Sequence, residues 1–317
     1  MRTLVAGGAG FIGSHLCARL LDEGYEVVCV DNLSTGDARN VEPLRARRRF
    51  SYEQVDIIHR LPDLGRFEAV FNLASPASPP GYMRRPLETA RVNSRGTENL
   101  LDVAAASGGR FLQASTSEVY GDPLEHPQTE TYWGNVNPNG VRACYDEGKR
   151  YAEMVTFVYW RSLGVDARII RIFNTYGPHS DPNDGRIVPQ FVSQALRGEP
   201  ITVHGDGGQT RSFCYVSDLV DGIMPAMFSA GTTGEVFNLG NPDERRVREV
   251  AEIVNRLCGN RSQIVYEPQP RADDPMRRCP DINRARTMLG WQPTVPLEDG
   301  LARTIAWFRT RLGIAVG

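Results

Sequence analysis

The stretch Gly7-Gly8-Ala9-Gly10-Phe11-Ile12-Gly13 follows directly on a short apolar run at residues 2–6. Residues 14–23 then have the character of a helix, and residues 26–30 form a second apolar run that ends at Asp31. Glycines at this spacing allow a tight turn, let the backbone approach a pyrophosphate, and permit a helix to pack closely on a strand. This order of strand, glycine turn, helix and strand predicts a doubly wound parallel α/β sheet of the Rossmann type.

The cofactor that this pattern predicts is NAD rather than NADP. Asp31 stands where a carboxylate accepts hydrogen bonds from the ribose hydroxyls of a dinucleotide, and its negative charge repels a 2′-phosphate. The phosphates are expected at the N-terminus of the first helix, where unpaired N–H groups and the helix dipole favour an anion. The residues of these segments predicted to bind the cofactor are Gly7, Gly10, Phe11, Ile12, Gly13, Asp31, Asn32, Asp56, Ile57, Leu73 and Ala74.

The alternation of strands and helices continues along the first half of the chain. The pattern predicts strands at residues 69–73, 110–114 and 166–172, and helices at residues 88–106 and 145–163. Ligands of such sheets bind outside the carboxyl ends of the strands, so the loops that follow these strands are candidates for the site.

The character of the sequence changes after Asn174, where glycine, proline and charged residues become more frequent. Two later runs, residues 212–219 and 236–240, indicate elements that return to the first sheet. We therefore predict a larger dinucleotide-binding domain and a smaller α/β substrate-binding domain. The larger one comprises residues 1–173 with residues 213–240, and the smaller one residues 174–212 and 241–317, ending in a helix at residues 297–312.

Charge and composition exclude several classes of protein. The formal net charge is −2, so no general positive field draws the chain to nucleic acid or to a membrane surface. No run reaches the ~18 apolar residues of a membrane span, and the first residues lack the pattern of a secretory signal. Six cysteines are scattered without a C-x-x-C pair, and no metal-ligand spacing is found. We predict a cytoplasmic protein that binds no metal, no nucleic acid and no membrane.

The stretch Tyr145-Asp146-Glu147-Gly148-Lys149 places a tyrosine and a lysine four residues apart, on one face of a helix. An ammonium beside a phenol stabilises the phenolate and is expected to lower a phenol pKa that starts near ~10. Such a tyrosine can act as a base near neutral pH. The spacing alone is also typical of an ordinary helix surface, so both interpretations stay open on this motif by itself.

Six further blocks carry a resemblance to a known family: residues 73–80 (LASPASPP), 115–123 (STSEVYGDP), 142–150 (RACYDEGKR), 171–178 (RIFNTYGP), 183–186 (NDGR) and 209–213 (QTRSF). With the glycine turn they resemble the extended short-chain dehydrogenase/reductase superfamily, in its branch of NAD-dependent nucleotide-sugar epimerases, dehydratases and decarboxylases. The resemblance spans essentially the whole chain. Within the branch, the blocks are most similar to those of UDP-glucuronate decarboxylases.

The resemblance implies roles for three residues in the first step of the reaction. Tyr145 would take the proton of the sugar C4 hydroxyl while hydride passes from C4 to NAD⁺. Lys149 would tune Tyr145 and hold the nicotinamide ribose, so both residues count among the cofactor contacts. Thr116 would hydrogen-bond the C4 oxygen. The resulting ketone lies β to the C6 carboxylate, which is then easily lost as CO₂ before C4 is reduced again to give UDP-xylose.

Three other positions are implied to decide what happens to the ketone. Ser117 occupies the place where the dehydratases carry an acidic residue, so the acid for dehydration is missing. Arg278 would bind and orient the C6 carboxylate. Glu118 would disfavour the neighbouring negative charge or handle the proton at C5. The plainer interpretations are a capping carboxylate at a strand end for Glu118 and a surface or diphosphate arginine for Arg278.

The resemblance also implies the substrate contacts: Arg211 and Arg271 at the UDP diphosphate, with Pro80, Tyr82, Glu118, Asn174, Arg186, Val188 and Arg278 around the nucleotide sugar. The sequence departs from the family pattern in two places. Residues 137–142 read NPNGVR instead of NPIGPR, and His179 follows Gly177-Pro178 where the family has arginine. We expect both departures on the sugar side of the site.

Two other functions remain open at this stage. A UDP-glucuronate 4-epimerase would share the first oxidation and re-reduce the other face of the ketone to give UDP-galacturonate. A non-catalytic NAD-binding protein could use the same fold, since fold does not fix function. The family also implies a homodimer, formed through the helices near residues 88–106 and 145–163.

Overall fold

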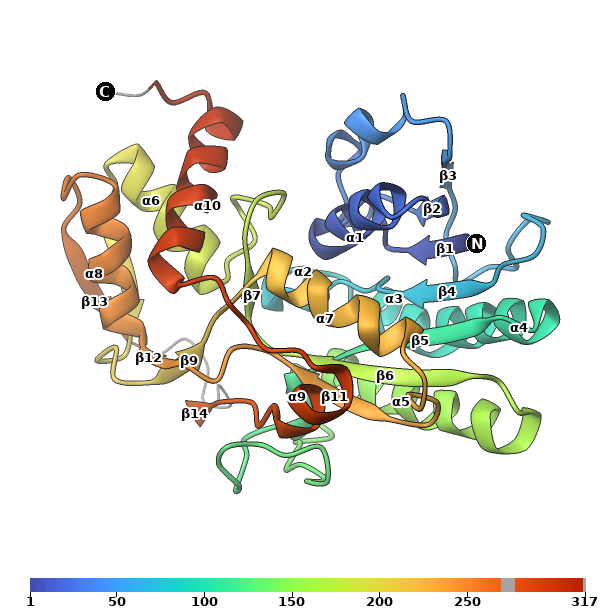
Figure 1. Ribbon diagram of the computed structural model, residues 1–317. Helices are drawn as coiled ribbons and strands as arrows, with labels where there is room; N and C mark the ends of the chain where they lie inside the picture. The colour runs from blue at the N-terminus through green and yellow to red at the C-terminus, as the bar shows by residue number, and fades with distance from the viewer. Residues whose placement is uncertain (269–276, 316–317) are drawn as a thin grey trace.

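A computed structural model of the 317-residue chain describes residues 1–268 and 277–315. Its centre is a parallel seven-stranded sheet with strand order β11-β6-β5-β4-β1-β2-β3 (Figure 1). The order reverses between β1 and β4, which is where ligands of doubly wound sheets bind. The predicted α/β class is confirmed. The strands are β1 (Arg2–Ala6), β2 (Glu26–Asp31), β3 (Phe50–Gln54), β4 (Ala69–Asn72), β5 (Arg110–Thr116), β6 (Ala167–Ile172) and β11 (Val236–Leu239).

Helices cover both faces of this sheet, which is why its strands are apolar throughout. On β1, Val5 packs into one core with α1 (Phe11–Asp22) and α7 (Val216–Phe228), whereas Leu4 packs into the other. The helices of that second face are α4 (Thr97–Ser107) and α5 (Ala143–Leu163). The shorter helices α2 (Pro79–Arg84), α3 (Pro86–Arg91) and α9 (Asn283–Leu289) complete this part of the molecule.

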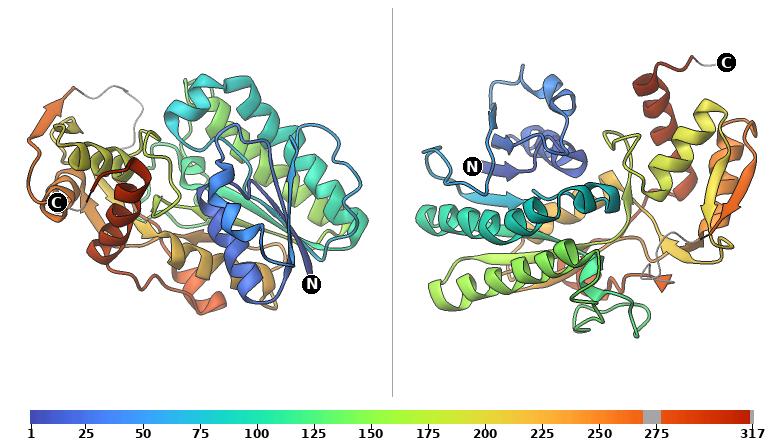
Figure 2. Two further views of the ribbon diagram at one scale, coloured as in Figure 1. Left: turned by 90° about the horizontal axis from the view of Figure 1, so that it is seen from above. Right: turned by 180° about the vertical axis from the view of Figure 1, so that it is seen from behind.

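A second group of elements lies beyond the carboxyl ends of the central strands (Figure 2). Its core is formed by α6 (Ile187–Arg197), α8 (Val247–Leu257) and α10 (Leu297–Leu312). Three small sheets accompany the helices. They pair β8 (Ile201–His204) with β13 (Ile264–Glu267), β7 (Thr175–Tyr176) with β10 (Cys214–Tyr215), and β9 (Thr210–Ser212) with both β12 (Glu244–Arg246) and β14 (Arg277–Arg278).

Two predicted elements differ from those observed. The helix expected at residues 88–106 is divided into α3, a π-helical turn at Val92–Gly96, and α4. The expectation that residues 212–219 add to the first sheet is wrong, because β10 pairs with β7 in a separate small sheet and α7 begins at Val216. Asp218 explains the second error, because its carboxylate accepts from the backbone N–H groups of Thr294 and Val295 and ties the start of α7 to a distant loop.

The division into two domains stays a prediction. It is supported by the pairing of β11 with β6, which returns residues 236–239 to the central sheet. None of the helices within residues 1–268 and 277–315 is long and apolar enough to cross a membrane.

Candidate active site

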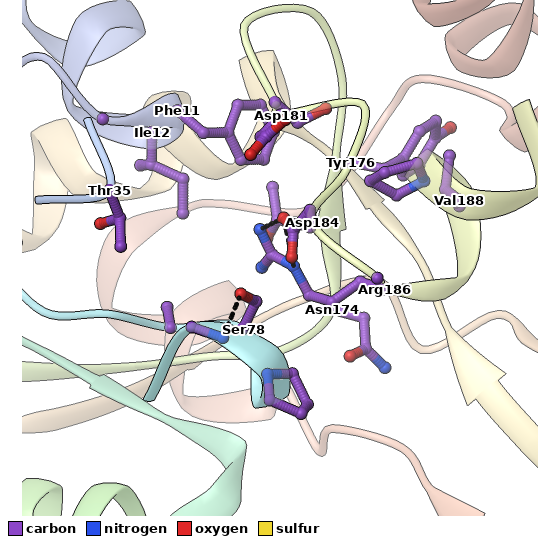
Figure 3. A pocket seen from close by; sticks show the side chains of 18 of the residues that line it. Phe11, Ile12, Thr35, Ser78, Asn174, Tyr176, Asp181, Asp184, Arg186 and Val188 are labelled. Atoms are coloured by element: carbon purple, nitrogen blue, oxygen red, sulfur yellow. Dashed lines mark hydrogen bonds and ion pairs between the residues drawn. The ribbon is translucent and has the colours of Figure 1, made fainter. Parts of the chain in front are cut away.

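A cavity of about 930 Å³ opens at the carboxyl ends of the central strands. Its walls come from both groups of elements, including the glycine turn, the end of β5, α5 and the segment before α6. Figure 3 shows Phe11 and Ile12 on one side of this cavity and Asn174, Arg186 and Val188 on another. A smaller cavity of about 270 Å³ adjoins it beside β2.

The glycine turn forms a cradle that no larger residue could form. A Cβ atom on Gly13 would lie 2.1 Å from the carbonyl oxygen of Gly7, and one on Gly7 would lie 2.8 Å from the Ala74 nitrogen. Gly7 also has φ +77°, a left-handed conformation that favours glycine. The backbone therefore comes close to α1 at the point where that helix exposes its first N–H groups.

Asp31 is fixed at the end of β2 by the backbone. Its Oδ2 accepts from the Ala9 N–H at 3.0 Å, and its Oδ1 from the Leu33 N–H at 2.8 Å. Burial raises the pKa of this carboxyl, and the backbone hydrogen bonds oppose that rise. The smaller cavity is lined by Asp31 together with Gly7, Gly10, Asn32, Asp56, Ile57, Leu73 and Ala74.

These features fit a bound dinucleotide. Eight of the residues predicted to bind the cofactor line the smaller cavity. Phe11, Ile12 and Gly13 line the adjoining larger cavity, so the two cavities form one continuous groove. The groove combines a backbone cradle for a pyrophosphate with a carboxylate for ribose hydroxyls. Arg39, the nearest cation in sequence, is paired with Asp37 at 2.7 Å rather than turned to Asp31.

Tyr145 and Lys149 lie inside the larger cavity and not on a helix surface. Their exposed fractions are 5% and 3%, and both line the cavity. Lys149 Nζ donates to the Ala114 carbonyl at 2.9 Å and lies 5.9 Å from the centre of the Tyr145 ring. The Thr116 hydroxyl is hydrogen-bonded to the Tyr145 phenol. The structure therefore brings the three residues together as predicted and excludes the surface interpretation.

The expected lowering of the Tyr145 pKa is not found. Burial raises the pKa of Tyr145, while the Thr116 hydrogen bond opposes this rise. Burial also lowers the pKa of Lys149 to about 7. The reason is that both groups lie deep in the protein, where desolvation disfavours the phenolate and the ammonium alike. The spacing of the motif could predict their proximity but not the cost of burying them.

Glu118 is held between two buried arginines. It belongs to a 3₁₀ turn, η4 (Ser117–Tyr120), and accepts hydrogen bonds from Arg278 and from Arg142. Burial raises the pKa of Glu118, but Arg278 and Arg142 outweigh it and lower the value to about 2. The cap of η4 is Thr116, which accepts from the Glu118 N–H at 3.2 Å. This geometry excludes a capping role for the Glu118 carboxylate.

Arg278 reaches this turn from β14. Its exposed fraction is 3%, so it is not a surface residue. Besides Glu118, its guanidinium lies 3.5 Å from Ser117 Oγ and donates to the Gly121 carbonyl at 3.0 Å. Its Nε is buried and has no hydrogen-bond partner among residues 1–268 and 277–315. Arg278, Glu118 and Ser117 all line the larger cavity beside Tyr145.

Sequence reasoning missed Arg142. It is 5% exposed, lines the cavity, and its Nε lies 3.7 Å from Asp146 Oδ2 in addition to its contact with Glu118. Its position three residues before Tyr145, one helical turn away, could have identified it. Tyr82 was predicted as a sugar contact; its ring stacks on that of Tyr145, with centroids 5.0 Å apart and planes inclined by 4°.

The predicted nucleotide-sugar contacts have mixed outcomes. Arg186 pairs with Asp184, Nε to Oδ2 at 2.8 Å, as Figure 3 shows. Arg211 is 7% exposed and lies beside Arg278 in the register of β9 and β14. Asn174, Val188, Arg186 and Arg211 line the cavity, whereas Pro80 is not part of its lining and would contact any side chain added at Gly185. Arg271 lies outside the described residues.

The expectation that His179 lies on the sugar side stays a prediction, and its ring packs on α1. Its ring stacks on His15 of α1 with centroids 4.6 Å apart, and its Nδ1 lies 2.9 Å from Ser14 Oγ. Burial, His15 and Arg311 lower the pKa of His179 to about 4. The residue therefore packs as a neutral ring against the helix that follows the glycine turn.

One group of potential metal ligands comes together from distant parts of the chain: His126, Glu244 and Cys279. These residues already contact one another or other protein groups, and two of them form an ion pair. His126 Nε2 lies 3.1 Å from Glu244 Oε2, and Glu244 also accepts from Thr210. Cys279 donates to the Pro242 carbonyl at 3.4 Å. We assign no metal to this group.

Residues 3–240 match the model of the NAD dependent epimerase/dehydratase family. The chain belongs to this family. Curated relatives include UDP-glucuronic acid decarboxylase 1 of Danio rerio, 50% identical over 98% of this chain and 73% of that protein. UDP-glucuronic acid decarboxylase 5 of Arabidopsis thaliana is also 50% identical, over 99% of this chain and 91% of that protein. The predicted resemblance is confirmed.

Solved structures of family members share the fold. The UDP-glucose 4-epimerase of Thermotoga maritima with UDP-glucose has a TM-score of 0.89 at 33% identity, covering 98% of this chain and all 100% of that one. The UDP-glucuronic acid 4-epimerase of Bacillus cereus, in complex with UDP-glucuronic acid and NAD, has a TM-score of 0.89 at 28% identity over 98% and 100%. The family depends on NAD, in agreement with the dinucleotide groove.

Proposed function

We propose that this chain decarboxylates UDP-glucuronate to UDP-xylose by oxidising C4, releasing C6 as CO₂ and reducing C4 again. The observation that carries the proposal is the contact of Arg278 with Glu118 in the cavity that holds Tyr145. Arg278 is the cation and Glu118 the anion of this contact. We propose that both lie beside C6, where UDP-glucuronate carries a carboxylate and a neutral sugar does not. The identity of about half of all residues to UDP-glucuronic acid decarboxylases agrees with it.

The first step takes place at Tyr145. Its phenolate removes the proton of the C4 hydroxyl, and Thr116 orients the C4 oxygen by a hydrogen bond. Bound NAD⁺ supplies the acceptor for the C4 hydride and the source that returns it. The ammonium of Lys149 stabilises the phenolate through space. Because all three residues are buried, these charges act on the sugar with little screening by water.

The second step takes place at Arg278 and Glu118. A ketone at C4 is β to the C6 carboxylate, and the electrons left on C5 when CO₂ departs delocalise into the C4 carbonyl. Arg278 lines the cavity and would bind the substrate carboxylate through its guanidinium, whose buried Nε has no hydrogen-bond partner among the described residues. Glu118, ionised beside the same guanidinium, places a like charge next to that carboxylate, and the loss of CO₂ relieves the repulsion. A pKa of about 2 disfavours the alternative in which Glu118 supplies a proton to C5.

Incubation with UDP-glucuronate and mass spectrometry of the product tests this function. We expect a nucleotide sugar lighter than the substrate by the mass of one CO₂. A product of unchanged mass would instead identify a 4-epimerase, which the shared fold with the Bacillus cereus enzyme keeps as the second candidate. No product at all would favour a non-catalytic NAD-binding protein.

We infer further that the chain forms a homodimer through α4 and α5. The outer face of α5 exposes large apolar side chains: Tyr151 (37%), Met154 (48%) and Val158 (47%). They recur at helical spacing opposite the buried catalytic face, and such a stripe favours packing against another helix. We expect light scattering to give twice the chain mass, and Met154→Asp/Val158→Asp to reduce it to one chain.

A matched control is Leu124→Asp, since Leu124 is 82% exposed but lies in a loop away from α5. This variant should keep the mass of the dimer. A monomeric wild-type protein, or a dimer that survives the double substitution, would contradict the inferred interface.

A further inference from the structure

The catalytic face of α5 continues for one more helical turn beyond Lys149. Tyr145, Lys149 and Glu153 follow one another at intervals of four residues and so lie on one face of the helix. All three are buried, with exposed fractions of 5%, 3% and 9%. The reaction proposed above gives Tyr145 and Lys149 a role but leaves Glu153 without one. A buried carboxylate is costly unless it is paired, so its partners indicate what it does.

The Glu153 carboxylate is fixed by two neighbouring strands. Ser115 Oγ donates to Oε1 at 2.5 Å, and Arg171 donates from Nε to Oε1 at 3.0 Å and from Nη2 to Oε2 at 2.8 Å. Ser115 and Arg171 are neighbours in the register of β5 and β6. A two-pronged contact from a guanidinium fixes the plane of a carboxylate as well as its position. Glu153 is therefore a fixed anion on the face of α5 that packs against β5 and β6.

Three consecutive residues at the end of β5 hold the three residues of α5. The Ala114 carbonyl accepts from Lys149, Ser115 donates to Glu153, and Thr116 is hydrogen-bonded to Tyr145. The strand thus fixes the spacing of phenol, ammonium and carboxylate. No ion pair joins Glu153 to Lys149 directly among the described contacts, so Glu153 acts on Lys149 through space.

We propose that Glu153 is a positioning residue that keeps on Lys149 the single proton which Lys149 and Tyr145 share in the active state. With one proton between them, the pair is either phenolate with ammonium or phenol with neutral amine. Only the first form can take the proton of the C4 hydroxyl. A fixed negative charge one turn beyond Lys149 favours this form. The inference rests on the proposed oxidation of C4 by Tyr145.

The charges around the pair are consistent with this role. Burial lowers the pKa of Lys149 to about 7, and Glu153 is the neighbouring charge that opposes the shift. Other charges face Tyr145 instead: Glu118 from η4, Asp146 from α5 itself, and Arg186 from the loop before α6. Arg171 of β6 pairs with the Glu153 carboxylate itself. Glu153 is therefore the charged residue that acts on the pKa of Lys149, whereas the other charges act on that of Tyr145.

The variant Glu153→Gln tests the proposal, because it keeps a side-chain oxygen for Ser115 and Arg171 but removes the charge. At acid pH, where both groups are protonated, kcat/KM of the variant should equal that of the wild type. The wild-type profile should level off near the Lys149 pKa of about 7. The variant should level off about one pH unit lower, at about one tenth of the wild-type plateau, since one pKa unit is a tenfold change.

Three variants separate charge from structure. Ser115→Ala removes a hydrogen bond to Glu153 but leaves its charge, so its profile should level off at the wild-type pH. Glu153→Asp keeps the charge and should restore most of the plateau. If Glu153→Gln fails to fold because Arg171 loses its partner, Glu153→Gln/Arg171→Gln removes both charges and should show the same shift. A kcat/KM reduced by one factor at every pH would overturn the proposal.

A second measurement needs no substrate. The unfolding free energy of the full chain is measured against pH and compared with that of Lys149→Met in the same background. Because Lys149 titrates near 7 when folded and near 10.5 when unfolded, the difference should favour the wild type increasingly as pH rises through this range. In Glu153→Gln the rise should start about one pH unit lower. An identical starting pH would overturn the inference, whereas a shifted start in a protein that leaves UDP-glucuronate unchanged would overturn only the proposed function.

Discussion

The two ends of the cavity are built in different ways. The oxidising end consists of Tyr145, Lys149 and Thr116. These residues lie on β5 of the central sheet and on α5, which packs against it. The carboxylate end joins Glu118 to Arg278, which is 160 residues later in the chain and belongs to a small sheet outside the central one. The first end lies on two neighbouring elements, and the second depends on the contact between two groups of elements.

This difference suggests how one family carries several reactions. Its solved structures include 4-epimerases and a 4,6-dehydratase with the same fold. Oxidation of C4 is common to these reactions, and we place it on the shared sheet. The fate of the ketone depends on residues supplied from elsewhere, so it can change without disturbing the first step. Substitutions that disable one end at a time can therefore separate the two steps.

Loss of the base at the oxidising end should have the largest effect. Tyr145→Phe keeps the ring that stacks on Tyr82 but removes the hydroxyl, so kcat should fall by about 10³-fold or more, within the range for general-base removal. Steady-state kinetics with UDP-glucuronate measures it. Tyr151→Phe is the matched control, because Tyr151 is on the same helix but bonds Glu98 outside the cavity. A Tyr145→Phe enzyme of wild-type activity would contradict the mechanism.

Loss of the carboxylate end should reduce decarboxylation by about 10²-fold while leaving the oxidising residues intact. In Arg278→Met, the substrate carboxylate loses its cation and Glu118 loses one of its two arginines. Product analysis should show that less of the consumed substrate loses CO₂. Arg277→Met is the control, since the Arg277 side chain is 62% exposed and does not line the cavity. Equal effects of the two substitutions would remove Arg278 from the site.

A change in the cofactor cradle should weaken NAD binding. The Cβ of Gly13→Ala would lie 2.1 Å from the Gly7 carbonyl oxygen, so the turn must open. We expect at least about tenfold weaker binding of NAD by calorimetry, as expected for a displaced backbone site. Gly140→Ala is the control, because the three atoms nearest to its Cβ would all belong to Asn137 of the same loop, at 3.0 Å or more. Unchanged affinity in Gly13→Ala would place the cofactor elsewhere.

A prediction of a different kind concerns stability at acid pH. The pKa of Glu118 is lowered to about 2 in the folded chain, so the unfolded chain binds its proton more readily. The stabilisation is complete above the unfolded pKa near ~4.3 and is lost as pH falls towards the folded value, a change of about 3 kcal/mol. Glu118→Gln should therefore lose less unfolding free energy than the wild type over this range. If the unfolding free energies of the wild type and of Glu118→Gln fall equally with pH, Glu118 is not held as an anion.

The oxidising end could be predicted from the sequence because its parts are local. The glycine turn, Asp31 and the four-residue spacing of Tyr145 and Lys149 each have a periodicity or a position that follows from strand and helix geometry. The resemblance to the family then supplied Arg278, which no spacing could connect with Glu118.

What the sequence could not predict depends on contacts between distant segments. The second arginine on Glu118 and the packing of His179 on His15 arise only when these segments meet in the folded chain. The same holds for the direction of the Tyr145 pKa, because burial is a property of the whole fold. The break of the helix at Val92–Gly96 and the early end of the strand before α7 likewise have no clear marker in the local pattern.

The most direct test of the account uses UDP-glucuronate labelled at C6. The wild-type enzyme and Arg278→Met are each incubated with it, and the label released as CO₂ is compared with the substrate consumed. We predict one labelled CO₂ for each substrate molecule consumed by the wild type, and a clear fall of that ratio or of the rate in the variant. Consumption of the substrate by the wild type with the label retained in the nucleotide sugar would contradict the account.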